Sequence, residues 1–121
     1  MTEAGALLYF EDETPAALRL AQAAGLEPHR IERHRFPDGE IQLALPAHLP
    51  ARVVLLRSLH QPGDKLTELM LTAPTARQLG ARHLSLVAPY LAYMRQDMAF
   101  APGQAVSQRI VGRWLATLFD A

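Results

Sequence analysis

The run Val53-Val54-Leu55-Leu56 is the feature that most constrains the fold of this chain. Because successive side chains of a strand point to opposite faces, this run is apolar on both faces, which is typical of a central strand in a parallel sheet. A second apolar run, Leu84 to Ala88, predicts another buried strand. Between the two runs, apolar residues recur at helical spacing at Leu66, Leu69, Met70, Ala73 and Ala76. Strands that alternate with helices predict a three-layer α/β domain, a mostly parallel sheet flanked by helices on both faces.

The amino-terminal part adds a strand and a helix. Ala6 to Phe10 is a short apolar run, typical of a buried strand. Thr14 and Pro15 have the residue types of a helix N-cap followed by a first-turn proline, and Gly25 has the residue type that follows a helix end. We therefore expect a helix between Thr14 and Gly25.

Three further elements follow from turn and helix signals. Ile31–Phe36 and Ile41–Leu45 are predicted as two strands on either side of the turn Pro37-Asp38-Gly39. Pro74 lies within the predicted central helix, where its missing amide predicts a kink or an early helix end. A last amphipathic helix is predicted through Val106, Ile110, Trp114 and Leu118.

Length and composition exclude several classes of protein. The chain has 121 residues, the size of one domain, and half of them are apolar. Twelve Lys and Arg balance twelve Asp and Glu, so no overall field favours nucleic acid or an acidic membrane. There is no cysteine, which excludes disulfides and thiolate chemistry. No apolar stretch has the length of a membrane span, and we expect a cytoplasmic protein.

The segment Arg35-Phe36-Pro37-Asp38-Gly39-Glu40 is the first candidate binding motif. Phe36 offers a flat face for a heterocycle. If the stretch is extended, the carboxylates of Asp38 and Glu40 point the same way and favour a donor such as an exocyclic amine. Two plainer interpretations stay open: Phe36 packs at the strand end, and the rest is a solvated hairpin turn.

The segment Tyr93-Met94-Arg95-Gln96-Asp97 is the second candidate motif. The planar guanidinium of Arg95 stacks on rings or binds phosphate, and the amide of Gln96 is able to read a base edge. Asp97 is expected to orient Arg95. Tyr90 and Tyr93 are expected to pack beneath the loop rather than to contact a ligand, and a plain surface role for Arg95 remains the alternative.

Other chemistries find no support in the sequence. The five histidines have no metal-ligand spacing, so no protein-only metal site is predicted. If His29 and His34 share one strand, their odd separation places them on opposite faces. The serines lie in no nucleophile elbow, and neither a P-loop nor a G-x-G-x-x-G fingerprint is present.

Three segments together resemble the amino-terminal half of ribose-phosphate pyrophosphokinase (PRPP synthetase): residues 35–40, Pro62 to Leu69, and Pro89 to Asp97. The resemblance runs from about Leu7 to Phe119. It implies a phosphoribosyltransferase-like fold, homo-oligomers, and transfer of the β,γ-pyrophosphoryl group of Mg-ATP to the C1 hydroxyl of ribose 5-phosphate, giving PRPP and AMP. It also implies that Phe36, Asp38 and Glu40 belong to the adenine pocket, often contributed across a subunit boundary. Arg95 and Gln96 would line the ATP site from the other side, with Asp97 in support.

The same resemblance implies that this chain holds only part of such an enzyme. The family's catalytic-site histidine, its flexible Lys/Arg loop and its ribose-5-phosphate loop would follow Ala121, so no catalytic residue is assigned here and the chain alone is expected to be inactive. The loop Met98 to Gly103 is short and uncharged, as in archaeal-type members. The alternative hypothesis is a non-catalytic regulatory or nucleotide-binding subunit.

Overall fold

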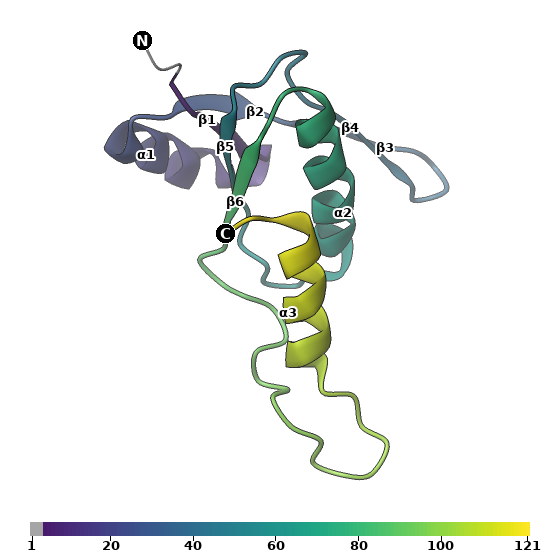
Figure 1. Cartoon of the computed structure of the whole chain (residues 1–121). Helices are drawn as coiled ribbons and strands as arrows, with labels where there is room; N and C mark the ends of the chain where they lie inside the picture. Colours follow the sequence, from purple (N-terminus) through teal and green to yellow (C-terminus); the bar gives the residue numbers. More distant parts are fainter. Residues whose placement is uncertain (1–3) are drawn as a thin grey trace.

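The computed structural model describes residues 4–121 and shows a four-stranded parallel sheet with a separate two-stranded hairpin (Figure 1). The sheet order is β2-β1-β5-β6. Its strands are β1 (Ala6–Tyr9), β2 (Glu27–Arg30), β5 (Arg52–Leu56) and β6 (His83–Val87). The hairpin joins β3 (Glu32–Arg35) to β4 (Ile41–Ala44), and the α-helices are α1 (Thr14–Ala24), α2 (Gly63–Gln78) and α3 (Ser107–Leu118).

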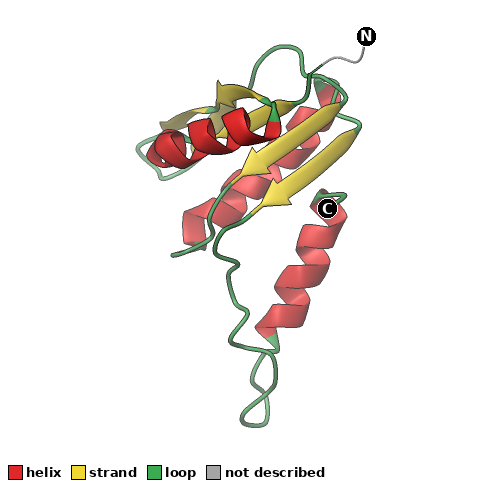
Figure 2. Ribbon diagram, turned by 90° about the vertical axis from the view of Figure 1, so that its left-hand side faces the viewer, coloured by secondary structure: helices red, strands yellow, loops and turns green. Residues whose placement is uncertain are grey.

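The two faces of the sheet are buried under different helices (Figure 2). On one face, Leu7 and Val54 pack with Ala17 and Ala21 of α1. The other face is covered by α2 and by the end of α3. The strand residues Leu8, Val53, Leu55 and Leu84 pack there with Leu69 and Ala73 of α2 and with Phe119, which follows α3. The predicted mostly parallel sheet with helices on both faces is therefore confirmed.

The sheet contains one strand that the sequence pattern did not reveal. β2 pairs in parallel with β1, from Ala6 opposite Glu27 to Tyr9 opposite Arg30. It carries the sequence Glu-Pro-His-Arg and lies at the edge of the sheet, where no apolar pattern is required. The strand predicted from Ile31 starts one residue later, because buried Ile31 separates β2 from β3. His29 and His34 consequently lie on different strands.

Two helix boundaries correct the sequence predictions. Thr14 is the first residue of α1 rather than its N-cap; a 3-10 turn precedes it, and its hydroxyl donates to the Glu11 carbonyl at 2.7 Å. Gly25 ends the helix as predicted, with φ of 67° in the left-handed region. Helix α2 continues past Pro74 to Gln78, so the predicted early end is wrong.

The apolar stripes of α2 and α3 are only partly covered. Met70 is 48% exposed and Ile110 is 61% exposed, although both were predicted on buried faces. They line a shallow apolar groove between the two helices with Leu66 and Trp114. Glu68 is instead fully buried in α2, because it has charged partners described below. Within residues 4–121, no helix is both long enough and apolar enough to cross a membrane.

Candidate functional site

The first motif forms the tight turn of the β3–β4 hairpin. The Phe36 amide donates to the Glu40 carbonyl at 2.8 Å, and the Gly39 amide donates to the Phe36 carbonyl at 2.9 Å. Gly39 has φ of 94°, a value that side chains disfavour. The Asp38 carboxylate accepts the Glu40 amide at 3.0 Å. The stretch is therefore a turn and not extended, and one oxygen of Asp38 already supports the backbone.

Phe36 is available at the tip of this hairpin. Its side chain is 40% exposed, so it is not a core residue. The ring of His34, two residues earlier and within β3, lies edge-on to the Phe36 ring at 4.7 Å between centroids with an interplanar angle of 85°. This contact uses part of the Phe36 ring and leaves the exposed part free for an aromatic ligand.

The second motif lies in the long loop between β6 and α3. Arg95 and Gln96 line a cavity of about 230 Å³ with Gln61, Tyr90 and Tyr93, together with Pro62 and Ala92. Tyr90 and Tyr93 are 48% and 36% exposed, so the expectation that they pack beneath the loop is wrong. Buried Ala92 fills that position, with an exposed fraction of 1%.

Backbone strain coincides with this cavity. Among residues 4–121, the non-glycine residues with positive φ are Gln61, at 49°, and Tyr93, at 66°, and both line it. Such conformations cost free energy and persist where the surrounding structure enforces them, often at ligand sites. The side-chain carbonyl of Gln96 accepts the Ser107 hydroxyl at 2.7 Å, which anchors the amide to the start of α3.

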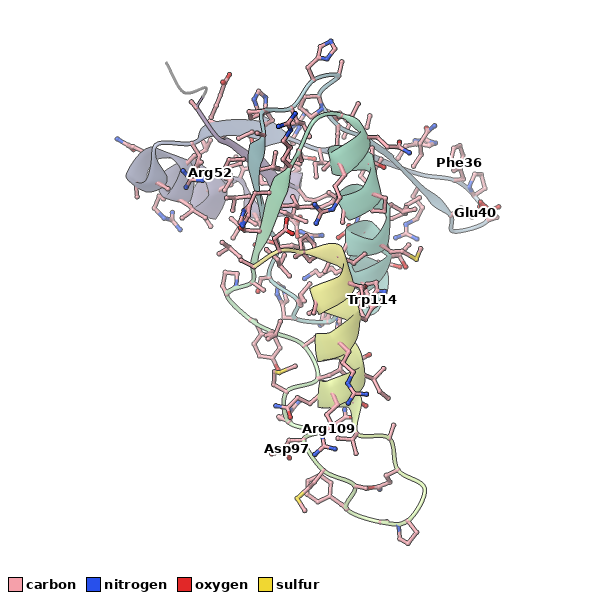
Figure 3. The ribbon with its side chains drawn as sticks, in the orientation of Figure 1. Phe36, Glu40, Arg52, Asp97, Arg109 and Trp114 are labelled. Carbon is pink, nitrogen blue, oxygen red and sulfur yellow. The ribbon has the colours of Figure 1, made fainter. Side chains whose placement is uncertain are left out.

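The two motifs do not meet within one chain. Figure 3 shows Phe36 and Glu40 at the tip of the hairpin, on one side of the molecule, and Asp97 in the loop at its lower end. The cavity beside Arg95 contains no residue of the hairpin. This cavity therefore does not unite the two motifs within one chain.

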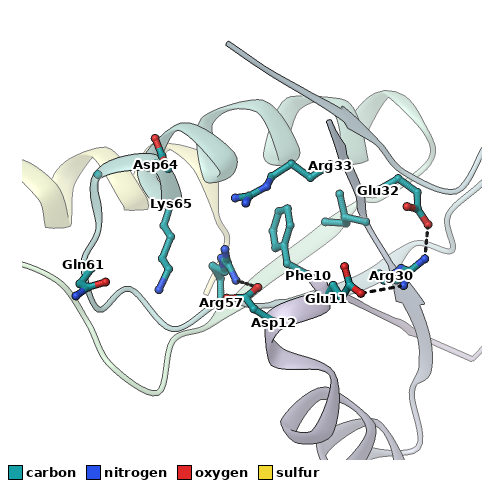
Figure 4. A pocket seen from close by; sticks show the side chains of 12 residues that line it. Phe10, Glu11, Asp12, Arg30, Glu32, Arg33, Arg57, Gln61, Asp64 and Lys65 are labelled. Atoms are coloured by element: carbon teal, nitrogen blue, oxygen red, sulfur yellow. Dashed lines mark hydrogen bonds and ion pairs between the residues drawn. The ribbon is translucent and has the colours of Figure 1, made fainter. Parts of the chain in front are cut away.

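A larger cavity, of about 850 Å³, lies at the carboxyl ends of β1, β2 and β5 (Figure 4). Its walls include Phe10, Asp12, Arg33, Arg57 and Lys65. The chain leaves β1 toward β2 on one side and returns to β5 on the other, so this cavity lies at the switch point where ligands collect in open α/β sheets. The sequence analysis did not identify it.

Buried charges form the inner wall of this cavity. Arg57 is 2% exposed and donates to Glu68 and Asp12 at 2.8 and 2.7 Å, while its guanidinium carbon lies 4.4 Å from the Phe10 ring centroid. Glu68 also accepts from Arg33 of the hairpin. Glu13 completes the network by accepting from Arg57 and from the Ser58 amide. Because each buried charge has an opposite partner, the network avoids an unpaired buried charge.

This network shifts the pKa of Arg57 and of Asp12. Burial works against the charge of Arg57, but the hydrogen bond to Asp12 and the charge of Glu68 outweigh it and raise the pKa of Arg57. Burial likewise opposes ionisation of Asp12, yet the bond to Arg57 and its charge hold the pKa of Asp12 below the ordinary value of 3.8. The sequence did contain one sign of this network: a charged residue, Arg57, directly follows the apolar run Val53 to Leu56.

Metal ligands do not gather in the part of the chain that the structure describes. No group of three or more His, Asp or Glu side chains in residues 4–121 has the arrangement of a metal site. Mg²⁺ keeps several waters and often binds through substrate phosphates with one or two carboxylates, so a nucleotide-borne Mg²⁺ does not require such a group.

Comparison with known proteins assigns the chain to a family. A family model described as the N-terminal domain of ribose phosphate pyrophosphokinase matches residues 6–118. The chain belongs to this family. Ribose-phosphate pyrophosphokinase of Methanopyrus kandleri is 39% identical over 104 residues, covering 85% of this chain and 36% of that protein. The Thermococcus kodakarensis protein of the same name is 36% identical over 112 residues, covering 93% of this chain and 38% of its own.

A solved structure shows the same fold. The phosphoribosylpyrophosphate synthetase of Mycobacterium smegmatis matches 96% of this chain and 40% of its own chain, with a TM-score of 0.81 at 18% sequence identity. At this identity the likeness concerns the fold, which is phosphoribosyltransferase-like as the resemblance implied. The chain spans a little over a third of the length of the relatives described above.

Proposed function

We propose that this chain is the ATP-binding and oligomer-forming amino-terminal domain of a ribose-phosphate diphosphokinase. The reaction would move the β,γ-pyrophosphoryl group of ATP to the C1 hydroxyl of ribose 5-phosphate, giving PRPP and AMP. Family membership over residues 6–118 supports the enzyme class. Mg²⁺ would arrive bound to the phosphates of ATP. The chain alone is expected to form no PRPP.

The observation that carries the nucleotide role is the exposure of two complementary half-sites, one on the hairpin and one on the loop between β6 and α3. The hairpin presents the free part of the Phe36 ring, with Asp38 and Glu40 beside it. The loop presents Arg95 and Gln96 in a cavity whose backbone is strained at two positions. Adenine needs a stacking face and groups that read its edge, and both kinds are present.

The separation of the half-sites supports a site shared between protomers. In a closed dimer, the hairpin of one protomer would lie against the loop of its partner, and symmetry would produce two equal sites. Asp97, exposed beside Arg95 and Gln96, would support the loop half-site rather than contact the base.

Binding of Mg-ATP to the purified chain, measured by calorimetry, tests the proposal. Phe36→Ala should weaken binding by about 1–3 kcal/mol, the range for a lost base-stacking face. Arg95→Lys keeps the charge but loses the planar fork, so it should also weaken binding. Ribose 5-phosphate without nucleotide serves as the control ligand. Unchanged ATP affinity in Phe36→Ala, with lower stability, would show that the ring only packs.

A mixing experiment tests the shared site. Phe36→Ala and Arg95→Ala chains each lack one half-site, but a mixed dimer would contain one intact site. Equal mixing should restore roughly a quarter of the original sites, because half of the dimers are mixed and each has one intact site of two. No recovery would mean that each protomer builds its own site.

A further inference from the structure

The hairpin that presents Phe36 is attached to helix α2 by two parallel ion pairs. Arg35 Nη2 donates to Asp64 Oδ2 at 2.7 Å, and Arg33 Nη1 donates to Glu68 Oε2. Both arginines belong to β3 and both carboxylates to α2. We call these four residues the arginine ladder.

The spacing of the arginine ladder follows from the geometry of its two elements. Arg33 and Arg35 are two residues apart, so they lie on one face of the strand and are separated by about 6.6 Å along it. Asp64 and Glu68 are four residues apart, so they lie on one face of the helix and are separated by about 6 Å of rise. The near match lets both pairs form at once, with the strand antiparallel to the helix.

Arg35 also extends the ladder into the turn itself. Its Nη1 donates to the Gly39 carbonyl at 2.9 Å while Nη2 holds Asp64. One planar guanidinium thus connects the turn that follows Phe36 to the first turn of α2. A lysine ammonium lacks this fixed fork, so it could not hold both acceptors in the same geometry.

The inner end of the ladder is anchored in the buried network. Glu68 has an exposed fraction of 0% and binds Arg57 as well as Arg33, so its position is fixed by the core. Asp64, at the outer end, is 67% exposed in its side chain. The ladder therefore runs from the core to the surface and ends next to the turn.

We propose that the arginine ladder positions the Phe36 turn for nucleotide, with Arg35 as the principal positioning residue. The proposal rests on the function proposed above. Arg35 acts through the Gly39 carbonyl and through Asp64, and does not itself contact the base. Its effect is to hold the ring of Phe36 in one orientation before the ligand arrives, which lowers the ordering cost of binding.

The test uses the intact chain and the variants Arg35→Lys and Asp64→Asn. Glu27→Gln is the matched control, because its side chain is 69% exposed on β2, outside the ladder. Mg-ATP affinity is measured by calorimetry and stability by a urea melt. Asp64→Asn should weaken ATP binding about two- to fivefold, the range for one exposed ion pair. Arg35→Lys should weaken it about tenfold, since both bonds of its fork are affected.

Two further measurements separate positioning from a general loss of stability. Asp64→Asn should speed hydrogen exchange at the Gly39 and Glu40 amides while buried strand amides keep their rates. In a Phe36→Ala background, Asp64→Asn should have little further effect on ATP affinity, because the ring that it orients is gone.

The outcomes distinguish this inference from the proposed function. Failure of the unaltered chain to bind Mg-ATP would overturn the proposed function and the nucleotide role of the ladder together. Binding by the unaltered chain with the same affinity in Arg35→Lys and Asp64→Asn would overturn the ladder alone. Equal loss of affinity with and without the Phe36 ring would also overturn it, since the effect would then not pass through the turn.

Discussion

The hairpin and the loop from Pro89 to Val106 present the two candidate half-sites, and they are held in different ways. The hairpin has paired strands, a turn closed by backbone bonds, and ion pairs to α2. The loop has no regular element, and its inner backbone bonds, from Gln96 to Tyr93 and from Gln104 to Ala101, are both 3.2 Å long. Phe100 in this loop is 70% exposed.

If both candidate half-sites bind nucleotide as proposed, this difference predicts that they meet the ligand in different states of order. A turn clamped by charges loses little conformational freedom on binding. A loop with few backbone bonds and little buried apolar surface belongs to the low-stability part of a fold and would be ordered by its ligand. Tyr93, whose φ is positive, follows Ala92, which is buried in the core, so this part of the loop packs against the fold.

Removing the anchor of the hairpin should produce the largest effect. Glu68→Ala leaves buried Arg57 without its innermost partner, so unfolding free energy should fall by about 3–5 kcal/mol. In the loop, Gln96→Ala removes one exposed hydrogen bond and should cost about 1 kcal/mol or less. Urea melts of both variants measure this contrast, and similar losses in the two would contradict it.

The glycines at the two tips provide a matched pair. Gly39 and Gly103 have φ of 94° and 87°, and an added Cβ would meet no atom within 4 Å at either position. Gly39→Ala should cost about 1–2 kcal/mol, because the clamped turn retains the left-handed conformation. Gly103→Ala should cost less than about 0.5 kcal/mol, since the loop relaxes locally. Equal thermal shifts in the two variants would show that the loop is as constrained as the turn.

Native-state hydrogen exchange compares the regions without mutation. The amides of Phe36 and Gly39 close the hairpin turn at 2.8 and 2.9 Å. We expect them to exchange about tenfold or more slowly than the amides of Gln96 and Gln104, corrected for intrinsic rates, because local opening of the loop costs less. Faster exchange in the turn than in the loop would reverse the comparison.

Lowering the pH should weaken the charge network behind the hairpin, and this is the smallest of the four predicted effects. The folded pKa of Asp12 lies below its ordinary 3.8, so its contribution to stability is present above that pH and is lost as the pH falls through the folded value. Asp12→Asn should therefore lower stability slightly at pH 7, and the difference from the unaltered chain should vanish in acid. Unfolding curves over a pH series measure this. Asp97→Asn, in the loop, is the control, and a persistent difference for Asp12→Asn in strong acid would exclude the titration as its cause.

The elements that the sequence determined are those specified by local pattern. Val53–Leu56 had to be a buried strand because consecutive apolar residues leave no polar face for solvent. The strand predicted at Leu84–Ala88 also forms, but the prediction that it is buried is wrong beyond Leu84, because β6 lies at the sheet edge and Val87 is 37% exposed. Gly25 had to end a helix and Gly39 had to lie in a turn, because their backbone conformations depend on a missing Cβ. The motifs also identified the family, because their residue types and spacing can be read directly from the sequence. The assignment of both motifs to a nucleotide site stays a prediction.

Tertiary structure decided what depends on distant partners. β2 forms because its backbone pairs with the backbone of β1, and the side-chain pattern of β2 does not predict this pairing. Glu68 is buried, and Met70 is not, because Arg33 and Arg57 converge on the carboxylate from two other elements. The separation of Phe36 from Arg95 also arises only when the hairpin and the loop leave the fold in different directions. Backbone pairing with β1 stabilises β2, and ion pairs with distant arginines stabilise the buried Glu68. Both depend on contacts that form only when the chain folds.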